Sequence, residues 1–346
     1  MKTEVLQIQN PAESTAALAK AAAALKRGGL VVFPTETVYG IGGIATSEVA
    51  AHAIYEAKGR PSDNPLIVHI ADPRDAELYA RTSETYYRLA AHFMPGPLTV
   101  ILPKKNTVPD AVTGGLPTVA LRVPAHPVAA ALIRAVGVGI AAPSANLSGR
   151  PSPTTAAHVI EDLSGRVDMI IDGGECDVGL ESTIISLDGD VATLLRPGAI
   201  TADALACVCS EVKIAPAVTA QLAKNERPLS PGMKYRHYAP RATLTLLDGH
   251  AEDISSYLKS LAADNTVGIL CYDEEISALQ GAATLFPIGG KNDLETQAKR
   301  LFALLREADE HPKLEKLYAH LPPQEGLGLA LYNRLIRAAA HTIKKV

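Results

Sequence analysis

The sequence predicts an α/β protein of two domains. Short apolar runs alternate with helical patterns along most of its 346 residues, which is typical of α/β folds. The chain is also too long for one typical core, and 47% of its residues are hydrophobic. The alternation breaks once, at residues 227–241, where three prolines forbid a regular helix or central strand. We therefore predict a first domain over 1–212, a linker or flap over 213–241 and a smaller Rossmann-like α/β domain over 242–346.

The first domain begins with an alanine-rich helix predicted over residues 14–27, with Ser14 as its N-cap and Gly28-Gly29 as its end. Apolar runs then predict strands at 30–33, 66–70, 98–102, 119–123, 138–142, 169–171, 184–187 and 192–195. Helical patterns between them predict helices at 48–58, 84–93, 127–135 and 155–163. Because the later strands follow one another closely, we expect a mixed rather than wholly parallel sheet.

The second domain resumes the alternation after the prolines. Its predicted strands lie at 244–247, 267–271 and 317–320. Its predicted helices lie at 253–261, 293–308 and 327–340. A unit of about a hundred residues is within the usual range for a compact domain.

Charge and cysteine content limit the classes of function that fit this chain. The formal net charge of -4 argues against a protein that mainly coats nucleic acid. Residues 111–160 nevertheless contain three arginines and no acid, which predicts a positive region suited to a small anionic ligand. The four cysteines lack metal-ligand spacing, so we expect free, buried thiols. Without a signal-peptide pattern or a long apolar run, the sequence predicts a cytoplasmic protein.

The most informative segment runs from the strand at 30–33 to the end of the helix at 48–58. The strand stops at Pro34 and opens into a loop of hydroxyls, one carboxylate and three glycines. Lys58 and Arg60 then flank a glycine at the predicted helix end. Such a pair suits a phosphate chain. The guanidinium can donate two parallel hydrogen bonds to one phosphate, and the ammonium acts as a mobile point charge. A solvated helix C-terminus, where cations are favoured anyway, explains the pair equally well.

Three further segments could contact a ligand. Ser144 and Asn146 follow a predicted strand, where open α/β sheets place ligands. The segment 173–183 is rich in glycine and hydroxyls, and Arg196 ends a predicted strand. Each of these also fits an ordinary turn or strand end. The linker has four cations and no acid over 227–241, so it is either a flap that touches an anion or a basic linker on an acidic surface.

Two nucleotide-binding motifs are absent. Gly289-Gly290-Lys291 lacks the upstream glycine of a Walker A loop and is followed by Asn292. The glycines after residue 39 lie six residues beyond their strand, whereas a dinucleotide fingerprint begins at the turn itself. We therefore do not expect either binding mode.

Taken in order, the motifs resemble those of the YrdC-type threonylcarbamoyl-adenylate synthases. The matching segments are Phe33-Pro34-Thr35-Glu36-Thr37-Val38-Tyr39-Gly40, Lys58-Gly59-Arg60-Pro61, Pro143-Ser144-Ala145-Asn146 and Glu181-Ser182-Thr183. The segment from Ser230 to Pro240 and the extra domain are similar to the long form of that family. The resemblance covers essentially the whole chain, and its ordered set of motifs is specific.

The resemblance implies a twisted first-domain sheet with a positive cavity, and a reaction of L-threonine, bicarbonate or CO₂ and ATP. It assigns the threonine site to Thr37, His69, Arg122, Ala142 and Ser182, with Arg122 on the carboxylate. It assigns the ATP site to Lys58, Arg60, Asn64, Thr118, Ser144, Asn146, Ser152, Arg196, Tyr235 and Tyr238, the two tyrosines lying in the flap. No protein nucleophile is expected, and Mg²⁺ is expected to be held mainly by the ATP phosphates, with its identity and ligands open.

The implied partners are ATP, L-threonine, bicarbonate and a separate threonylcarbamoyl transferase complex, with at most weak contact to tRNA. His69 is also explained as a packed residue of an apolar strand. Two other functions fit less well. An RNA-binding module would use the same positive region, but the chain is acidic and poor in aromatic residues. A carbamoyl-transfer domain of the hydrogenase-maturation type would be accompanied by zinc-finger cysteines, which are absent. The role of the second domain stays open.

Overall fold

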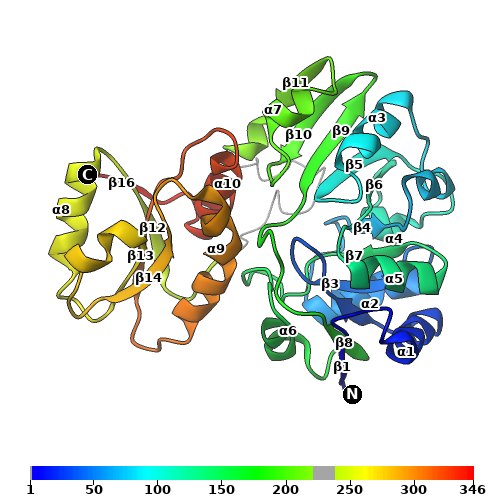
Figure 1. The fold of residues 1–346 in the computed structure, drawn as a ribbon, viewed down its shortest axis with the longest axis horizontal. Helices are drawn as coiled ribbons and strands as arrows, with labels where there is room; N and C mark the ends of the chain where they lie inside the picture. The colour runs from blue at the N-terminus through cyan, green and yellow to red at the C-terminus, as the bar shows by residue number, and fades with distance from the viewer. Residues whose placement is uncertain (1, 221–237) are drawn as a thin grey trace. The chain divides into compact units, whose positions relative to one another are not determined.

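The computed structural model describes residues 2–220 and 238–346. These residues group into two compact units, one with residues 2–148 and 152–220 and the other with residues 149–151 and 238–346. Each unit is built on its own sheet with helices packed against it (Figure 1). Among the described residues, no helix is both long and apolar enough to cross a membrane.

The first unit is an 11-stranded mixed sheet in the order β1-β8-β2-β3-β7-β4-β6-β5-β9-β10-β11. Its strands are β1 (Glu4–Gln7), β2 (Val31–Phe33), β3 (Gly40–Ile44), β4 (Ile67–His69), β5 (Leu98–Pro103), β6 (Thr118–Arg122), β7 (Ile140–Ala142), β8 (Met169–Asp172), β9 (Thr183–Asp188), β10 (Val191–Arg196) and β11 (Glu211–Ile214). Its helices are α1 (Thr15–Lys26), α2 (Glu48–Lys58), α3 (Glu84–Phe93), α4 (Asp110–Thr113), α5 (Pro127–Val136), α6 (Ala156–Leu163) and α7 (Ala202–Ala206), with short 3-10 turns η1 (Pro73–Leu78) and η2 (Pro216–Val218).

The second unit is a five-stranded, wholly parallel sheet in the order β14-β13-β15-β12-β16. Its strands are β12 (Thr243–Asp248), β13 (Val267–Tyr272), β14 (Thr284–Gly289), β15 (Lys316–His320) and β16 (Ile343–Lys345). Its helices are α8 (Ala251–Leu261), α9 (Leu294–Asp309) and α10 (Gly328–Ala338), with the 3-10 turn η3 (Asp273–Ala278). The α/β class, the mixed first sheet and the Rossmann-like second domain are therefore confirmed.

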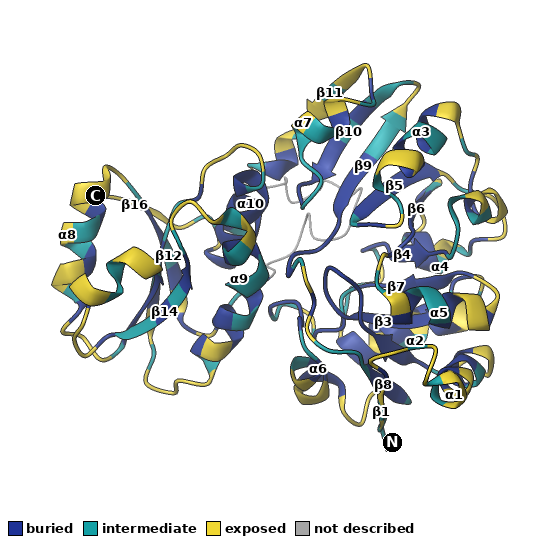
Figure 2. Cartoon of the chain, in the orientation of Figure 1, coloured by how far each residue is buried: buried dark blue, intermediate teal, exposed yellow. Residues whose placement is uncertain are grey.

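Burial explains how the first unit holds its sheet together. Leu18 and Leu25 of α1 and Leu132 of α5 are buried in one core with Phe33 of β2 and Ile171 of β8. Figure 2 shows exposed residues on the outer sides of these helices and buried residues along the strands. Burial of this apolar stripe is the main force that fixes an amphipathic helix on a sheet.

Every predicted strand and helix has a counterpart in the structure, but the interpretation of the glycines after Pro34 was wrong. Gly40, Gly42 and Gly43 lie in strand β3, which pairs with β2 and β7, rather than in a loop. A Cβ atom on Gly42 would lie 2.6 Å from Ile140 Cγ2 and 2.7 Å from Phe33 Cε1. Glycine is therefore used here for close packing, which a strand propensity scale does not detect.

Other elements went unpredicted because their local signals are weak. Strands β1 and β11 and the edge strand β16 are short and partly exposed. Ser14 occupies the N-cap position of α1 as predicted, although its side chain makes no capping hydrogen bond. The domain limits at 1–212, 213–241 and 242–346 stay predictions.

Candidate active site

The register of the large sheet brings several predicted residues together. β4 and β6 run parallel with His69 opposite Arg122, and β5 runs antiparallel to β6 with Thr99 opposite Arg122. β9 is the next strand beyond β5, and Ser182 directly precedes it. Three residues predicted to bind threonine therefore come from neighbouring strands, although they are far apart in the sequence.

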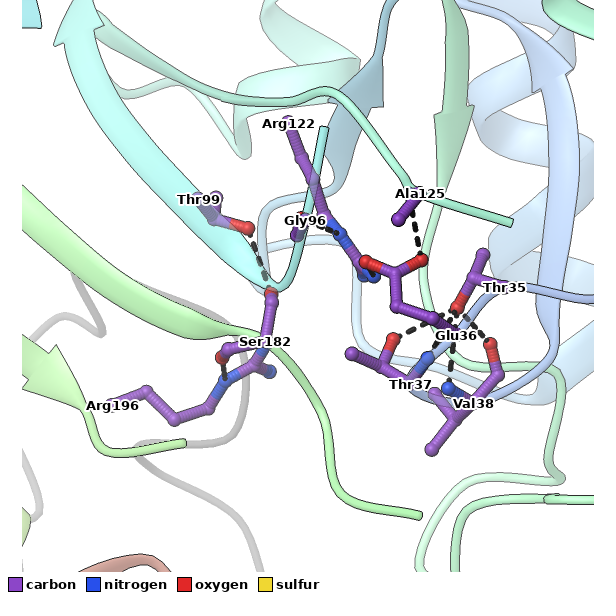
Figure 3. A network of polar contacts seen from close by, with 10 residues as sticks. All are labelled: Thr35, Glu36, Thr37, Val38, Gly96, Thr99, Arg122, Ala125, Ser182 and Arg196. Atoms are coloured by element: carbon purple, nitrogen blue, oxygen red, sulfur yellow. Dashed lines mark hydrogen bonds and ion pairs between the residues drawn. The ribbon is translucent and has the colours of Figure 1, made fainter. Parts of the chain in front are cut away.

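Arg122 is buried and has an acidic partner. Its Nη2 donates to Glu36 Oε1 at 2.7 Å, and its Nε donates to the Gly96 carbonyl at 3.4 Å (Figure 3). The second oxygen of Glu36 accepts from the backbone N–H of Ala125 at 3.0 Å. Both charged side chains are almost fully buried, at 4% and 9% exposed. The pair therefore fixes the direction of the guanidinium inside the site.

A turn of hydroxyls orients Thr37. Thr35 Oγ1 donates to the carbonyl of Val38 at 2.6 Å and lies 2.8 Å from Thr37 Oγ1. The backbone N–H groups of Thr37 and Val38 both approach Thr35 Oγ1 at 3.2 Å. These contacts fix the Thr37 side chain in one orientation, and in the contact between the two hydroxyls either one can donate.

His69 is neutral over the physiological range. Its Nδ1 faces the Ile67 carbonyl at 3.2 Å, and the ring lies edge-on to Phe33. Burial, and secondarily the positive charge of Arg122, lower the pKa of His69 to about 3. The ring also faces the backbone carbonyl of Ile140, so the carbonyls of Ile67 and Ile140 compete for the single proton of the neutral imidazole. Both packing and ligand contact remain compatible with this geometry.

Lys58 physically joins two of the predicted motifs. It lies in the last turn of α2, which ends at Gly59 in the left-handed conformation with φ 61°. The ammonium is buried and donates to the backbone carbonyls of Ser144 and Asn146. Ser144 Oγ in turn donates to Asn146 Oδ1 at 2.5 Å. The sequence predicts that Lys58 contacts phosphate. In the structure, its ammonium holds the backbone of the loop that contains Ser144 and Asn146.

Other predicted nucleotide residues lie in the same unit. Arg60 donates to the carbonyls of Asn64 at 3.3 Å and Pro65 at 3.2 Å. Asn64 Oδ1 is buried and, within 2–220 and 238–346, has no hydrogen-bond partner. Thr118 begins β6, at the opposite end of that strand from Arg122. An unpaired buried acceptor is costly, so a hydrogen-bond donor of a ligand at Asn64 Oδ1 would be favourable.

Ser152 and Ala142 are both buried. Ser152 Oγ donates to Glu181 Oε1 at 2.6 Å. Ala142 ends β7, where it pairs with Ile67 of β4. The hydrogen bond to Glu181 thus fixes the Ser152 side chain without a ligand.

Ser182 and Arg196 are directly hydrogen-bonded. Arg196 Nε donates to the Ser182 carbonyl and Arg196 Nη2 donates to Ser182 Oγ, both at 3.0 Å (Figure 3). Thr99 Oγ1 lies 2.7 Å from the same hydroxyl. A residue predicted to bind threonine and one predicted to bind ATP are therefore in contact.

The flap can be compared only in part. Tyr235 lies outside the described residues, as do Arg227, Lys234 and Arg236 of the basic linker. Tyr238 is described and belongs to the second unit, where its ring stacks on Phe302 with centroids 5.0 Å apart. Its predicted contact with the nucleotide stays a prediction.

Sequence reasoning missed three residues that hold the predicted ones. Glu36 and Glu181 adjoin predicted residues, and an acid inside such an apolar, hydroxyl-rich motif was a usable signal. Thr99 gave no signal, because threonine is ordinary in a strand. The described residues contain no group of three or more His, Cys, Asp or Glu side chains that could hold a metal ion, and we derive no step through one.

Comparison with known proteins gives consistent matches over both parts of the chain. Residues 23–198 match the Sua5/YciO/YrdC family model described as "Telomere recombination". Residues 200–340 match the model described as "Threonylcarbamoyl-AMP synthase, C-terminal domain". Threonylcarbamoyl-AMP synthase of Bacillus subtilis (strain 168) is 46% identical over 325 residues, with 93% of this chain and 92% of that protein covered.

The relative from Pyrococcus abyssi, also a threonylcarbamoyl-AMP synthase, is 43% identical over 94% of this chain and 95% of its own. The crystal structure of P. abyssi Sua5 complexed with L-threonine superposes with a TM-score of 0.90 at 41% identity and covers all of both chains. The chain therefore belongs to the Sua5-type threonylcarbamoyl-AMP synthase family.

Proposed function

We propose that this chain converts L-threonine, bicarbonate or CO₂ and ATP into L-threonylcarbamoyl-AMP and pyrophosphate. The reaction is the first step of threonylcarbamoyladenosine modification of tRNA next to the anticodon, and a separate transferase complex would complete it. The observation that carries the proposal is the full-length similarity to the P. abyssi structure complexed with L-threonine. Similarity over both parts of the chain favours this function over an RNA-binding module or a carbamoyl-transfer domain.

Threonine would bind where the sheet gathers its polar side chains. Arg122, held by Glu36, would pair with the carboxylate. Thr37, oriented by Thr35, would accept from the ammonium through its hydroxyl oxygen. Neutral His69, Ser182 and the backbone at Ala142 would contact the remaining polar groups. This supports a subsite that offers donors to the carboxylate and acceptors to the ammonium.

ATP would bind beside it. Lys58 and Arg60 would neutralise the triphosphate, with Asn64, Thr118, Ser144, Asn146, Ser152 and Arg196 completing the site and Tyr235 or Tyr238 closing over the nucleotide. The Ser182–Arg196 contact supports adjacent substrates, since it joins the two predicted subsites. Mg²⁺ carried on the ATP phosphates would lower their negative charge.

The chemistry needs positioning more than a protein nucleophile. The threonine amine first takes up CO₂ as a carbamate and loses a proton. A carbamate oxygen then attacks the α-phosphorus, the bond to the β-phosphate oxygen breaks, and pyrophosphate leaves. Fixed cations that neutralise the phosphates, and correct placement of the carbamate, supply the rate enhancement.

The direct test is pyrophosphate release from ATP, Mg²⁺, L-threonine and bicarbonate, with one component omitted at a time. We expect release only in the mixture that contains both threonine and bicarbonate. Intact ATP in the complete mixture would overturn the proposal.

Variants then test the ATP site. We expect Arg60→Ala to lower the rate of pyrophosphate release by about 100-fold, because a fixed cation on the phosphates is lost. Lys58→Ala should abolish pyrophosphate release. Its effect is harder to interpret, because Lys58 also holds the Ser144 and Asn146 carbonyls. The exposed Arg74→Ala is the matched control. Full activity in both Lys58 and Arg60 variants would refute the assignment.

A further inference from the structure

Three side chains in the first unit form what we call the Thr99–Ser182–Arg196 cluster. Thr99 and Ser182 are fully buried and Arg196 is 7% exposed. The Ser182 hydroxyl lies between the other two, 2.7 Å from Thr99 Oγ1 and 3.0 Å from Arg196 Nη2 (Figure 3). Thr99 comes from the middle strand β5, which is flanked by β6 and β9.

The protons of this cluster can be assigned by elimination. A guanidinium only donates, so Ser182 Oγ accepts from Arg196. Thr99 also has a hydroxyl proton to place, and within 2–220 and 238–346 its side chain has only Ser182 Oγ in hydrogen-bonding range. If Ser182 donated to Thr99 instead, the buried Thr99 proton would have no acceptor, which is unfavourable. Thr99 therefore donates to Ser182.

This assignment determines what Ser182 can offer to a ligand. Both lone pairs of its oxygen are engaged, one by Arg196 and one by Thr99. Only its own proton is left, so Ser182 must act as a hydrogen-bond donor.

We infer that Thr99 is a positioning residue for the proposed reaction. It makes the Ser182 hydroxyl a donor to an anionic oxygen of the substrate and holds that hydroxyl against Arg196. An ammonium cannot accept such a bond, and the neutral threonine hydroxyl is a weaker acceptor than an anionic oxygen. We therefore assign the bond to the threonine carboxylate or to the carbamate formed from its amine. The inference rests on the proposed function, because only that function places threonine beside Ser182.

The test is Thr99→Val, which keeps the shape and the β-branched side chain suited to β5 but removes the hydroxyl. We expect the KM of one substrate to rise about five- to tenfold, because Ser182 loses one of the two contacts that orient it. Thr99→Ser, which keeps the donor, should restore the wild-type KM to within about twofold. A role in stability alone would lower the melting temperature without this KM effect or its rescue.

Thr85→Val is the matched control. Thr85 is also buried, and its hydroxyl donates to Asp190 Oδ1 at 2.9 Å, outside the cluster. It should lower the melting temperature without changing any KM. If Thr99→Val does not fold, Thr99→Cys, which keeps the size with a weaker donor, takes its place.

Two further arms distinguish the acceptor. Weaker binding of L-threonine alone, measured by calorimetry without ATP or bicarbonate, assigns the bond to the carboxylate. Unchanged threonine binding with a raised KM for bicarbonate assigns it to the carbamate. Unchanged threonine affinity and unchanged KM for all three substrates in a folded variant overturn the inference. Failure of the proposed function would look different, since the wild-type protein itself would then release no pyrophosphate.

Discussion

At the scale of single residues, a buried ion pair joins two charged side chains of the first unit. Glu36 and Arg122 form this pair within the candidate threonine site. Removing one partner of a buried pair leaves the other charge without compensation, whereas exposed pairs contribute little. The Glu36 carboxylate should therefore matter both for stability and for threonine binding.

We expect Glu36→Gln to lower the free energy of unfolding by about 3 kcal/mol, because Arg122 loses its buried counter-charge. The KM for threonine should rise at least about tenfold, since the guanidinium is no longer held in one direction. Urea unfolding and steady-state kinetics measure the two effects. Glu4→Gln, which breaks an exposed pair with Lys20, is the control, and equal effects of the two substitutions would contradict the prediction.

His69 predicts a pH dependence of stability. Its pKa is about 3 in the folded protein and 6.5 when the side chain is free in water. As the pH falls below 6.5, the unfolded chain takes up this proton and the folded protein does not. The contribution of His69 therefore lowers the free energy of unfolding by up to about 1.4 kcal/mol per pH unit between 6.5 and 3.

Urea unfolding of wild type and His69→Asn at several pH values between 7 and 4 tests this. The variant should lose stability less steeply with acid than the wild type. His52→Asn, at an exposed position, is the control. Parallel curves for wild type and His69→Asn would refute the buried, neutral state.

At the scale of elements, the end of α2 positions the Lys-x-Arg motif. Gly59 ends the helix in the left-handed conformation, with open space around its missing Cβ. This turn separates Lys58, which holds the Ser144 loop, from Arg60, which holds the Asn64 loop. A change in backbone conformation at Gly59 should move both cations.

We expect Gly59→Ala to destabilise the protein by about 1 kcal/mol through backbone strain and to raise the KM for ATP. Gly28→Ala is the matched control, because Gly28 also has positive φ and open space but follows α1. It should cost similar stability and leave the KM unchanged. A raised KM for ATP in the Gly28 variant too would mean that the effect is not local to the motif.

Elements also show where sequence reasoning fails. The strand at 98–102 and the helix at 48–58 were predictable because hydrophobic periodicity and end signals agree there. Strand β3 was not, because its glycines are selected by contact with Phe33 and Ile140, which lie elsewhere in the sequence. Local propensity contains no information about such contacts.

At the scale of the whole molecule, the reactivity of the four cysteines tests the burial of residues in both units. All four are free thiols, and Cys176, Cys209 and Cys271 are buried as predicted. Cys207 is exposed, so the prediction of burial was wrong there. Burial raises the pKa of all three buried thiols, that of Cys271 to about 11. Thiolates are the reactive form, so the buried thiols should react slowly for two reasons.

We expect a chromogenic disulfide reagent to titrate one fast-reacting thiol in the native protein and four in denaturant. Cys207→Ser should abolish the fast phase and leave three thiols in denaturant. A second fast thiol in the native protein would contradict the predicted burial.

The sequence by itself determined the α/β class, the order of most helices and strands and, through ordered motifs, the family and the predicted ligand residues. Periodicity and chain-local motifs contain that information because backbone sterics and side-chain burial act over a few residues. Only the tertiary structure decided that Thr99 lies opposite Arg122, that Glu36 is the partner of Arg122 and that Lys58 holds the Ser144 loop. Strand order and long-range hydrogen bonds depend on packing across the whole sheet, which no local pattern specifies.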